Sequence, residues 1–209
     1  MRTMSGVRLY RPEDIPDEVI HAALDDARFA PSGGNRQPWR VMVIRDLDLR
    51  KKVSDISIRE WKIYTAKWYP PPEELTADQA RKLREGTEYH TNMHRAPVHL
   101  FVWAELGSLA LMDRNLDRVS FVGGGSIYPF VQNLQLALSV RGVGSRITAL
   151  AIPAEQEWAE LMSVPKGYGL AAVMTIGYPE WKATRLTRRP VESFARLESF
   201  DGPPLTISR

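Results

Sequence analysis

Apolar residues recur at helical spacing near the start of the chain. The stripe consists of Val19, Ile20, Ala23, Leu24 and Ala27. Steps of three and four residues predict an amphipathic helix over residues 16–30. Pro16 suits the first turn of this helix, because the N–H that proline lacks has no partner there in any helix.

Further apolar patterns predict the remaining elements. Helices are expected at 46–60, 73–85, 127–141 and 153–162, and core strands at 40–45, 96–104 and 170–176. The short run at 40–45 predicts a strand buried on both faces. The helix at 127–141 is apolar on nearly all faces, so we expect it at the centre of the fold or at a subunit interface. Ser126 suits its N-cap, and Gly142 suits its end.

Two segments depart from these patterns. Residues 61–95 hold an aromatic cluster followed by Pro70–Pro72, which cannot join regular helix or sheet pairing. The cluster is either a lid over a substrate or a packing patch; we assign Trp61 to packing and Trp68 and Tyr69 to the lid. The tail at 181–209 is rich in Arg and Pro, and we expect it to run along another surface, such as a partner subunit.

Length and composition narrow the protein class. The chain has 209 residues, 44% hydrophobic and 25% charged, which predicts a single domain spanning 1–209. A net charge of +3 gives no reason to expect nucleic acid as a partner. With no cysteine, disulfides and thiolate chemistry are excluded, which fits a cytoplasmic protein. No apolar run approaches the roughly 18 residues of a membrane span, so no membrane partner is expected.

The ionisable residues predict neither a metal site nor a catalytic group. His90 and His94 have the spacing of two ligands on one helix face, but no acidic residue completes a zinc motif. No side chain stands out as a general acid, base or nucleophile. The catalytic residues are therefore left unassigned.

The connection at 30–40 is the most distinctive stretch of the chain. Pro31 ends the preceding helix, and Gly33 and Gly34 allow a close backbone approach or a positive φ. Short polar side chains follow at Ser32, Asn35 and Gln37. Such a loop either surrounds a planar heterocycle or is an ordinary connection with a glycine turn.

The sequence Pro-Ser-Gly-Gly-Asn-Arg-Gln-Pro-Trp in this connection resembles the flavin loop of the nitroreductase family. Three further segments fit that family in the same order: 7–10 with 15–20, 126–134 with 141–145, and 176–179 with 188–192. The resemblance extends from about residue 5 to about residue 195. It implies an α+β fold with a mixed, mostly antiparallel sheet flanked by helices, and an intertwined homodimer that binds FMN.

The resemblance also implies an activity. Members transfer electrons by a ping-pong mechanism from NAD(P)H through FMN to a nitroaromatic, quinone or other electrophilic acceptor. Two alternatives stay open. One is a specialised flavin enzyme on the same scaffold, such as a biosynthetic dehydrogenase, a dehalogenase or a flavin-consuming enzyme. The other is a flavin-binding or storage protein with little turnover.

The family's flavin contacts transfer to particular positions of this chain. Arg8, Arg188 and Arg189 match arginines at the FMN phosphate or the pyrimidine edge. The loop residues expected against the flavin of the other subunit are Pro31, Ser32, Gly33, Asn35 and Gln37. Thr148, Ala149 and Leu150 are expected at the N5 side of the ring. Where many relatives carry a second basic residue and a serine, this chain has Met4, Ser5 and Gly6, so phosphate binding would depend more on the C-terminal arginines and on Ser5.

Overall fold

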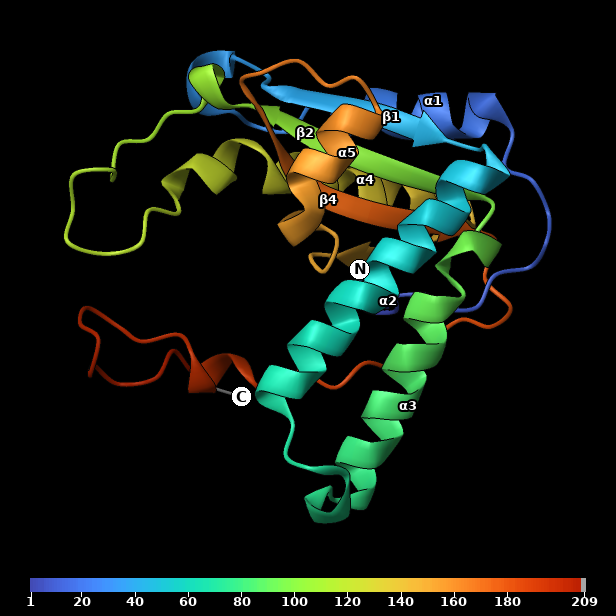
Figure 1. Ribbon diagram of the computed structural model, residues 1–209. Coiled ribbons are helices and arrows are strands. Elements are labelled where there is room, and N and C mark those ends of the chain that lie inside the picture. Colours follow the sequence, from blue (N-terminus) through green and yellow to red (C-terminus); the bar gives the residue numbers. More distant parts are fainter. Residues whose placement is uncertain (208–209) are drawn as a thin grey trace.

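A four-stranded antiparallel sheet forms the centre of the computed structural model, which describes residues 1–207 (Figure 1). The strands are β1 (Trp39–Ile44), β2 (Val98–Glu105), β3 (Gly144–Thr148) and β4 (Tyr168–Gly177). Their order in the sheet is β1-β2-β4-β3. The edge strands β1 and β3 are therefore separated by the two long central strands.

Residues 1–207 form five α-helices, which are α1 (Asp17–Ala27), α2 (Leu47–Trp68), α3 (Ala77–Thr91), α4 (Tyr128–Val140) and α5 (Glu155–Leu161). Short 3-10 helices occur at Gly33–Asn35, Pro72–Glu74, Met93–Arg95, Leu106–Ser108, Val122–Ser126, Ile152–Ala154 and Val191–Ser193. None of the helices within residues 1–207 is both long and apolar enough to cross a bilayer.

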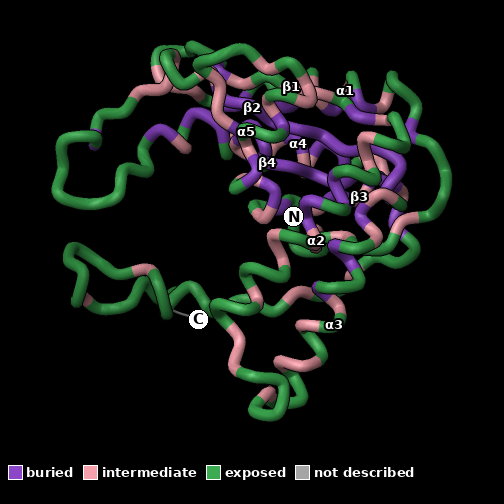
Figure 2. Tube along the Cα trace, in the orientation of Figure 1, coloured by how far each residue is buried: buried purple, intermediate pink, exposed green. Residues whose placement is uncertain are grey.

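Alternating side chains of the central strands divide the core into two layers. Leu100 and Val102 of β2 pack toward α1 and α4, where Leu134 is fully buried. Phe101 and Trp103 point to the opposite face, toward Trp158 of α5 and the start of α2. This alternation is the period-two pattern of a strand with apolar neighbours on both sides. Figure 2 shows the buried residues gathered in the sheet and the helices next to it.

The α2–α3 hairpin projects from this body, as Figure 1 shows. The side chain of Asp46 caps α2 by accepting from Leu49 N at 2.8 Å. A capping box between Thr76 and Gln79 begins α3. These local signals set the first residues of both helices. The proline-rich turn between the helices lies at the tip of the hairpin.

Several sequence expectations needed correction. The sheet has no parallel strand pair among residues 1–207, apart from an isolated parallel bridge between Gly6 and Ser145. The strand predicted at 40–45 to be buried on both faces is instead an edge strand. It pairs with β2 along one edge and has no strand beyond the other, and Val43 is 40% exposed. The strand β3 was not predicted at all, since its sequence Gly-Ser-Arg-Ile-Thr carries no apolar run.

Two local predictions about helices were also wrong. Ser126 does not cap α4; its Oγ accepts a hydrogen bond from Gly33 N at 3.0 Å instead. The aromatic segment after residue 60 is helical and continues α2 to Trp68, because the helix ends only at the prolines. By contrast, Gly142 ends α4 as predicted, with φ +79° and a hydrogen bond from Val143 N to Leu138 O at 3.0 Å.

Candidate functional site

The N-terminal segment is held along β3 and beside the end of β4. Val7 N donates to Ser145 O at 3.0 Å, and Gly144 leaves room for the Val7 side chain, which a Cβ there would meet at 2.6 Å. Further along, Tyr10 bridges to Pro179. This attachment places Arg8 next to the side chain of Arg146, which β3 carries.

Buried hydroxyl groups form a floor beside Arg146, whose Cζ lies 4.2 Å from the ring centroid of Tyr89. Thr175 Oγ1 lies 2.9 Å from the hydroxyl of Tyr10 and 3.0 Å from that of Tyr89. Burial raises the pKa of both tyrosines above the ordinary value, so their hydroxyls stay protonated. The floor therefore presents neutral hydrogen-bonding groups rather than negative charge.

Four cationic side chains line one cavity next to this floor. They are Arg8, Arg146, Lys182 and Arg185. Ser5 and Gly6 complete its N-terminal wall, and no carboxylate of the described residues lines it. The Nε atom of Arg146 is buried and has no hydrogen-bond partner within residues 1–207. A cationic cavity with an unpaired donor fits a phosphate-bearing ligand such as FMN.

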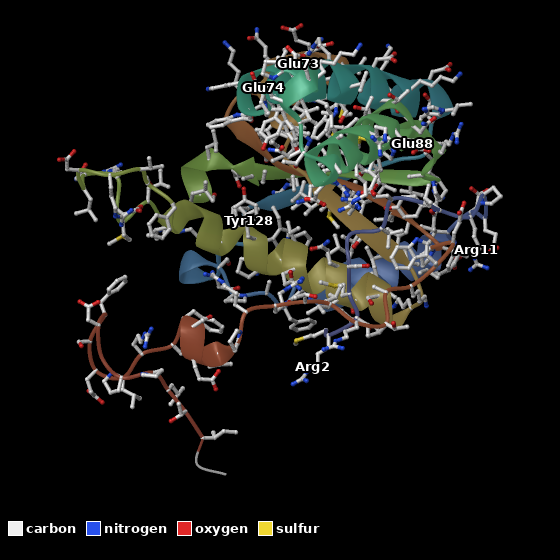
Figure 3. The ribbon with its side chains drawn as sticks, turned by 90° about the horizontal axis from the view of Figure 1, so that it is seen from below. Arg2, Arg11, Glu73, Glu74, Glu88 and Tyr128 are labelled. Atoms are coloured by element: carbon white, nitrogen blue, oxygen red, sulfur yellow. The ribbon has the colours of Figure 1, made fainter. Side chains whose placement is uncertain are left out.

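A second cavity of about 380 Å³ adjoins the first and shares Ser5, Gly6 and Arg8 with it. Its wall combines Tyr89 and Trp181 with polar residues, among them Glu88 of α3 and Asn92, which follows that helix. Figure 3 shows Glu88 on α3, and Glu73 and Glu74 at the tip of the hairpin. This volume lies in the range of small-molecule sites, and its mixed aromatic and polar wall suits a flat heterocycle.

The glycine loop predicted to contact flavin is a rigid turn. Ser32 Oγ accepts from Gln37 N at 3.0 Å, and Asn35 Oδ1 accepts from Gln37 Nε2 at 3.2 Å. Gly34, Asn35 and Gln37 all have positive φ. Trp39 then stacks on Phe130 with ring centroids 4.7 Å apart. Pro31, Ser32 and Gly33 belong to the same turn, which is braced against α4.

This loop and Arg8 lie at opposite edges of the sheet. The loop precedes β1, whereas Arg8 lies beside β3, and two strands separate them. One chain therefore does not bring the loop residues together with Arg8. Two copies of the chain are needed if both contact one ligand, as the expected dimer implies.

The remaining residues predicted to contact flavin or substrate lie at the end of β3, on the tail and at the end of α2. Thr148 is buried at the end of β3, where its Oγ1 accepts from Leu150 N at 3.2 Å, and Ala149 is exposed between them. Arg188 and Arg189 are exposed on the tail and do not line either cavity beside Arg8. Trp68 and Tyr69 end α2 near the tip of the hairpin.

Sequence reasoning missed several residues of this region. Arg146 lies just before the stretch at 148–150 that was expected to contact the ring, and Lys182 and Arg185 precede the arginine pair that was chosen. Tyr10 and Tyr89 carried no signal of their own. Only the pairing of β3 with the N-terminal segment brings these residues together, so the order of residues along the chain could not have identified them.

Comparison with known proteins identifies the family. The sequence profile of the Nitroreductase family matches residues 3–178. The chain belongs to the nitroreductase family. It is 24% identical over 191 residues to an NADH dehydrogenase of Thermus thermophilus, covering 90% of this chain and 88% of that protein. It is 25% identical over 217 residues to a 4-nitrobenzoate reductase of Pseudomonas putida, covering 94% and 92%.

A solved structure shows the same fold as this nitroreductase-family chain. It is an oxidized iodotyrosine deiodinase bound to FMN and 3-iodo-L-tyrosine, with a TM-score of 0.72 and 24% identity. The match covers 95% of this chain and 96% of that one. The expected nitroreductase-like α+β fold is therefore confirmed, with the sheet corrected to four antiparallel strands.

Proposed function

We propose that this protein is an FMN-dependent oxidoreductase that transfers electrons from NAD(P)H to a nitroaromatic, quinone or other electrophilic acceptor. The observation that carries the proposal is the cavity lined by Arg8, Arg146, Lys182 and Arg185 beside an aromatic cavity of about 380 Å³. Membership of the nitroreductase family and the FMN in a structural relative support it.

The chain's own residues would bind and orient the cofactor. Cationic side chains around Arg8 hold the phosphate, because guanidinium groups make charged, directional hydrogen bonds to phosphate oxygens. The backbone from Thr148 to Leu150 would hold the ring, and the loop at 31–37 of a second copy would complete the pocket. FMN, when bound, supplies the two-electron chemistry, so no protein acid or nucleophile is required.

A second candidate is a specialised reduction on the same scaffold, in particular reductive dehalogenation of a halogenated phenol. The deiodinase structure, with its TM-score of 0.72, is the observation that favours it. The two activities share the cofactor and differ in the acceptor. A binding or storage protein would hold flavin but turn over little NAD(P)H.

The visible spectrum of the purified protein, followed by chromatography of the heat-released cofactor, tests the first step. We expect FMN, at one per chain. Anaerobic reduction with NADH and NADPH then separates an enzyme from a storage protein, and reoxidation by 4-nitrobenzoate, a quinone or 3-iodotyrosine separates the acceptors. FAD, or no flavin after reconstitution, would contradict the proposal.

A further inference from the structure

Arg146 is a partly buried arginine without a counter-ion. Among residues 1–207 its guanidinium forms no ion pair and no hydrogen bond, and its Nε is fully enclosed. Burying an unpaired charge is unfavourable, and burial accordingly lowers the pKa of this guanidinium. The nearby charge of Arg8 acts in the same direction. An anionic ligand would remove both costs.

The surroundings hold Arg146 in place for such a ligand. Its Cζ lies 4.2 Å from the ring centroid of Tyr89, a residue that is itself 5% exposed. Its aliphatic stem passes Gly6, where a Cβ would lie 3.6 Å from Arg146 Cγ. The ring and the chain thus fix the side chain, while the guanidinium keeps its hydrogen-bonding donors for another partner.

The cavity around Arg146 has the charge of a multivalent anion site. Arg8, Lys182 and Arg185 line it, and Ser5 adds a hydroxyl. The N-terminal segment has Met4, Ser5 and Gly6 where a second basic residue and a serine were expected, so Arg8 is the cationic side chain that it contributes to the cavity. Arg188 and Arg189, chosen from sequence as phosphate ligands, lie outside the cavity.

We propose that Arg146 is the central ligand of a phosphate-monoester site, assisted by Arg8, Lys182 and Arg185. This inference rests on the proposed function and deepens it, because it assigns phosphate recognition to β3 and the start of the tail. Two phosphates share the required chemistry: the terminal phosphate of FMN and the 2′-phosphate of NADPH. A dianion between guanidinium groups accepts several charge-assisted hydrogen bonds.

Paired ligands that differ by one phosphate test this assignment. Apoprotein is titrated with FMN and riboflavin, and flavin-loaded protein with NADPH and NADH, for the wild type and for Arg146→Met. Methionine keeps the stem and removes the charge. We expect affinity to fall by about 10- to 150-fold for the phosphate-bearing member of one pair, the effect of losing hydrogen bonds to a charged group, and by less than about twofold for its partner. The affected pair identifies the source of the phosphate.

Controls separate this role from a structural one. Arg84→Met removes an exposed arginine of α3 that lines neither cavity, and it should change neither pair. Melting curves in phosphate and in chloride of equal ionic strength add a readout without flavin: phosphate should stabilise the wild type and not Arg146→Met. Equal losses for both members of each pair, or no loss, would overturn the assignment. If the wild type binds no flavin at all, the proposed function fails, whereas the phosphate melting curves still test the anion site.

Discussion

At the scale of single residues, His90 and His99 are buried imidazoles that the fold keeps neutral. Burial lowers the pKa of each to about 4, with Arg146 and Arg8 adding to the effect on His90. Each ring is paired: His90 Nδ1 lies 2.7 Å from Ser57 Oγ, and His99 Nε2 lies 2.9 Å from Met93 O. His94 similarly contacts Ser54, so the histidines that have metal-ligand spacing serve to join α2 to the next elements.

These two pKa values predict a stability that falls in mild acid. Between pH 6.5 and 4 the unfolded chain binds more protons than the folded one, so the free energy of unfolding decreases as pH falls. From pH 7.5 to 5 the expected loss is on the order of 2 kcal/mol per histidine. Urea titrations at the two pH values measure it. His99→Gln should reduce the pH dependence, and the exposed His21→Asn should not; a flat profile would contradict the prediction.

At the scale of elements, the α2–α3 hairpin depends on one close contact. A Cβ on Gly86 would overlap the ring of Trp61, which stacks on His90 at 5.0 Å and donates from Nε1 to Thr87 Oγ1 at 2.9 Å. Gly86→Ala should therefore destabilise the fold by about 1–3 kcal/mol, although alanine favours helix. Thermal melting checks this. Gly125→Ala is the control, because a Cβ at this position would have no neighbouring atom within 4 Å. Equal melting temperatures for the two variants would contradict the prediction.

The tip of the same hairpin tests the lid hypothesis. Trp68 is 65% exposed at the end of α2, and Tyr69 follows it. Replacing both by alanine should leave stability within about 0.5 kcal/mol and change the rate of flavin reoxidation by a bulky acceptor, with FMN affinity retained. Trp61→Ala is the packing control and should cost about 3 kcal/mol. Stopped-flow reoxidation with a small and a large acceptor decides; unchanged rates for both would reject the lid.

At the scale of the whole molecule, the position of exposed apolar side chains bears on the expected homodimer. The apolar faces of α4 are covered by α1 and the sheet of the same chain, so this helix alone does not require a partner. The exposed groups lie instead on the loop at 109–122 and on the tail, where Val119 is 86% and Phe200 95% exposed. Figure 2 shows both segments extending from the buried core. Large apolar side chains exposed on such projecting segments are typical of an interface.

Light scattering at micromolar concentration should therefore give about twice the chain mass of 23.7 kDa. Val119→Ser with Phe200→Ser should shift the protein toward monomer, because both remove apolar area from the interface. Ile63→Ser, at a 59% exposed position of α2 outside both segments, is the control and should leave the dimer intact. A monomeric wild type that still binds FMN would contradict a site shared between two copies.

The sequence by itself determined the features that depend on neighbouring residues. Helical spacing predicted α1 and α4, the apolar runs predicted β2 and β4, and the glycine after residue 141 ended α4 as expected. The loop at 31–37 was recognised because positive φ and short polar side chains have strong local preferences. The family also followed from these local motifs, read in order.

Only the tertiary structure decided what depends on partners distant in the chain. Whether β1 is central or at an edge depends on which strands pair, and its own residues do not specify that. The strand β3 forms because β4 supplies hydrogen bonds, although its sequence has no apolar run. Arg146 joins Arg8 only through the pairing of β3 with the N-terminal segment. Charges and burial in a site arise from such non-local contacts, so local spacing predicts the fold of this protein better than it predicts the ligands of its site.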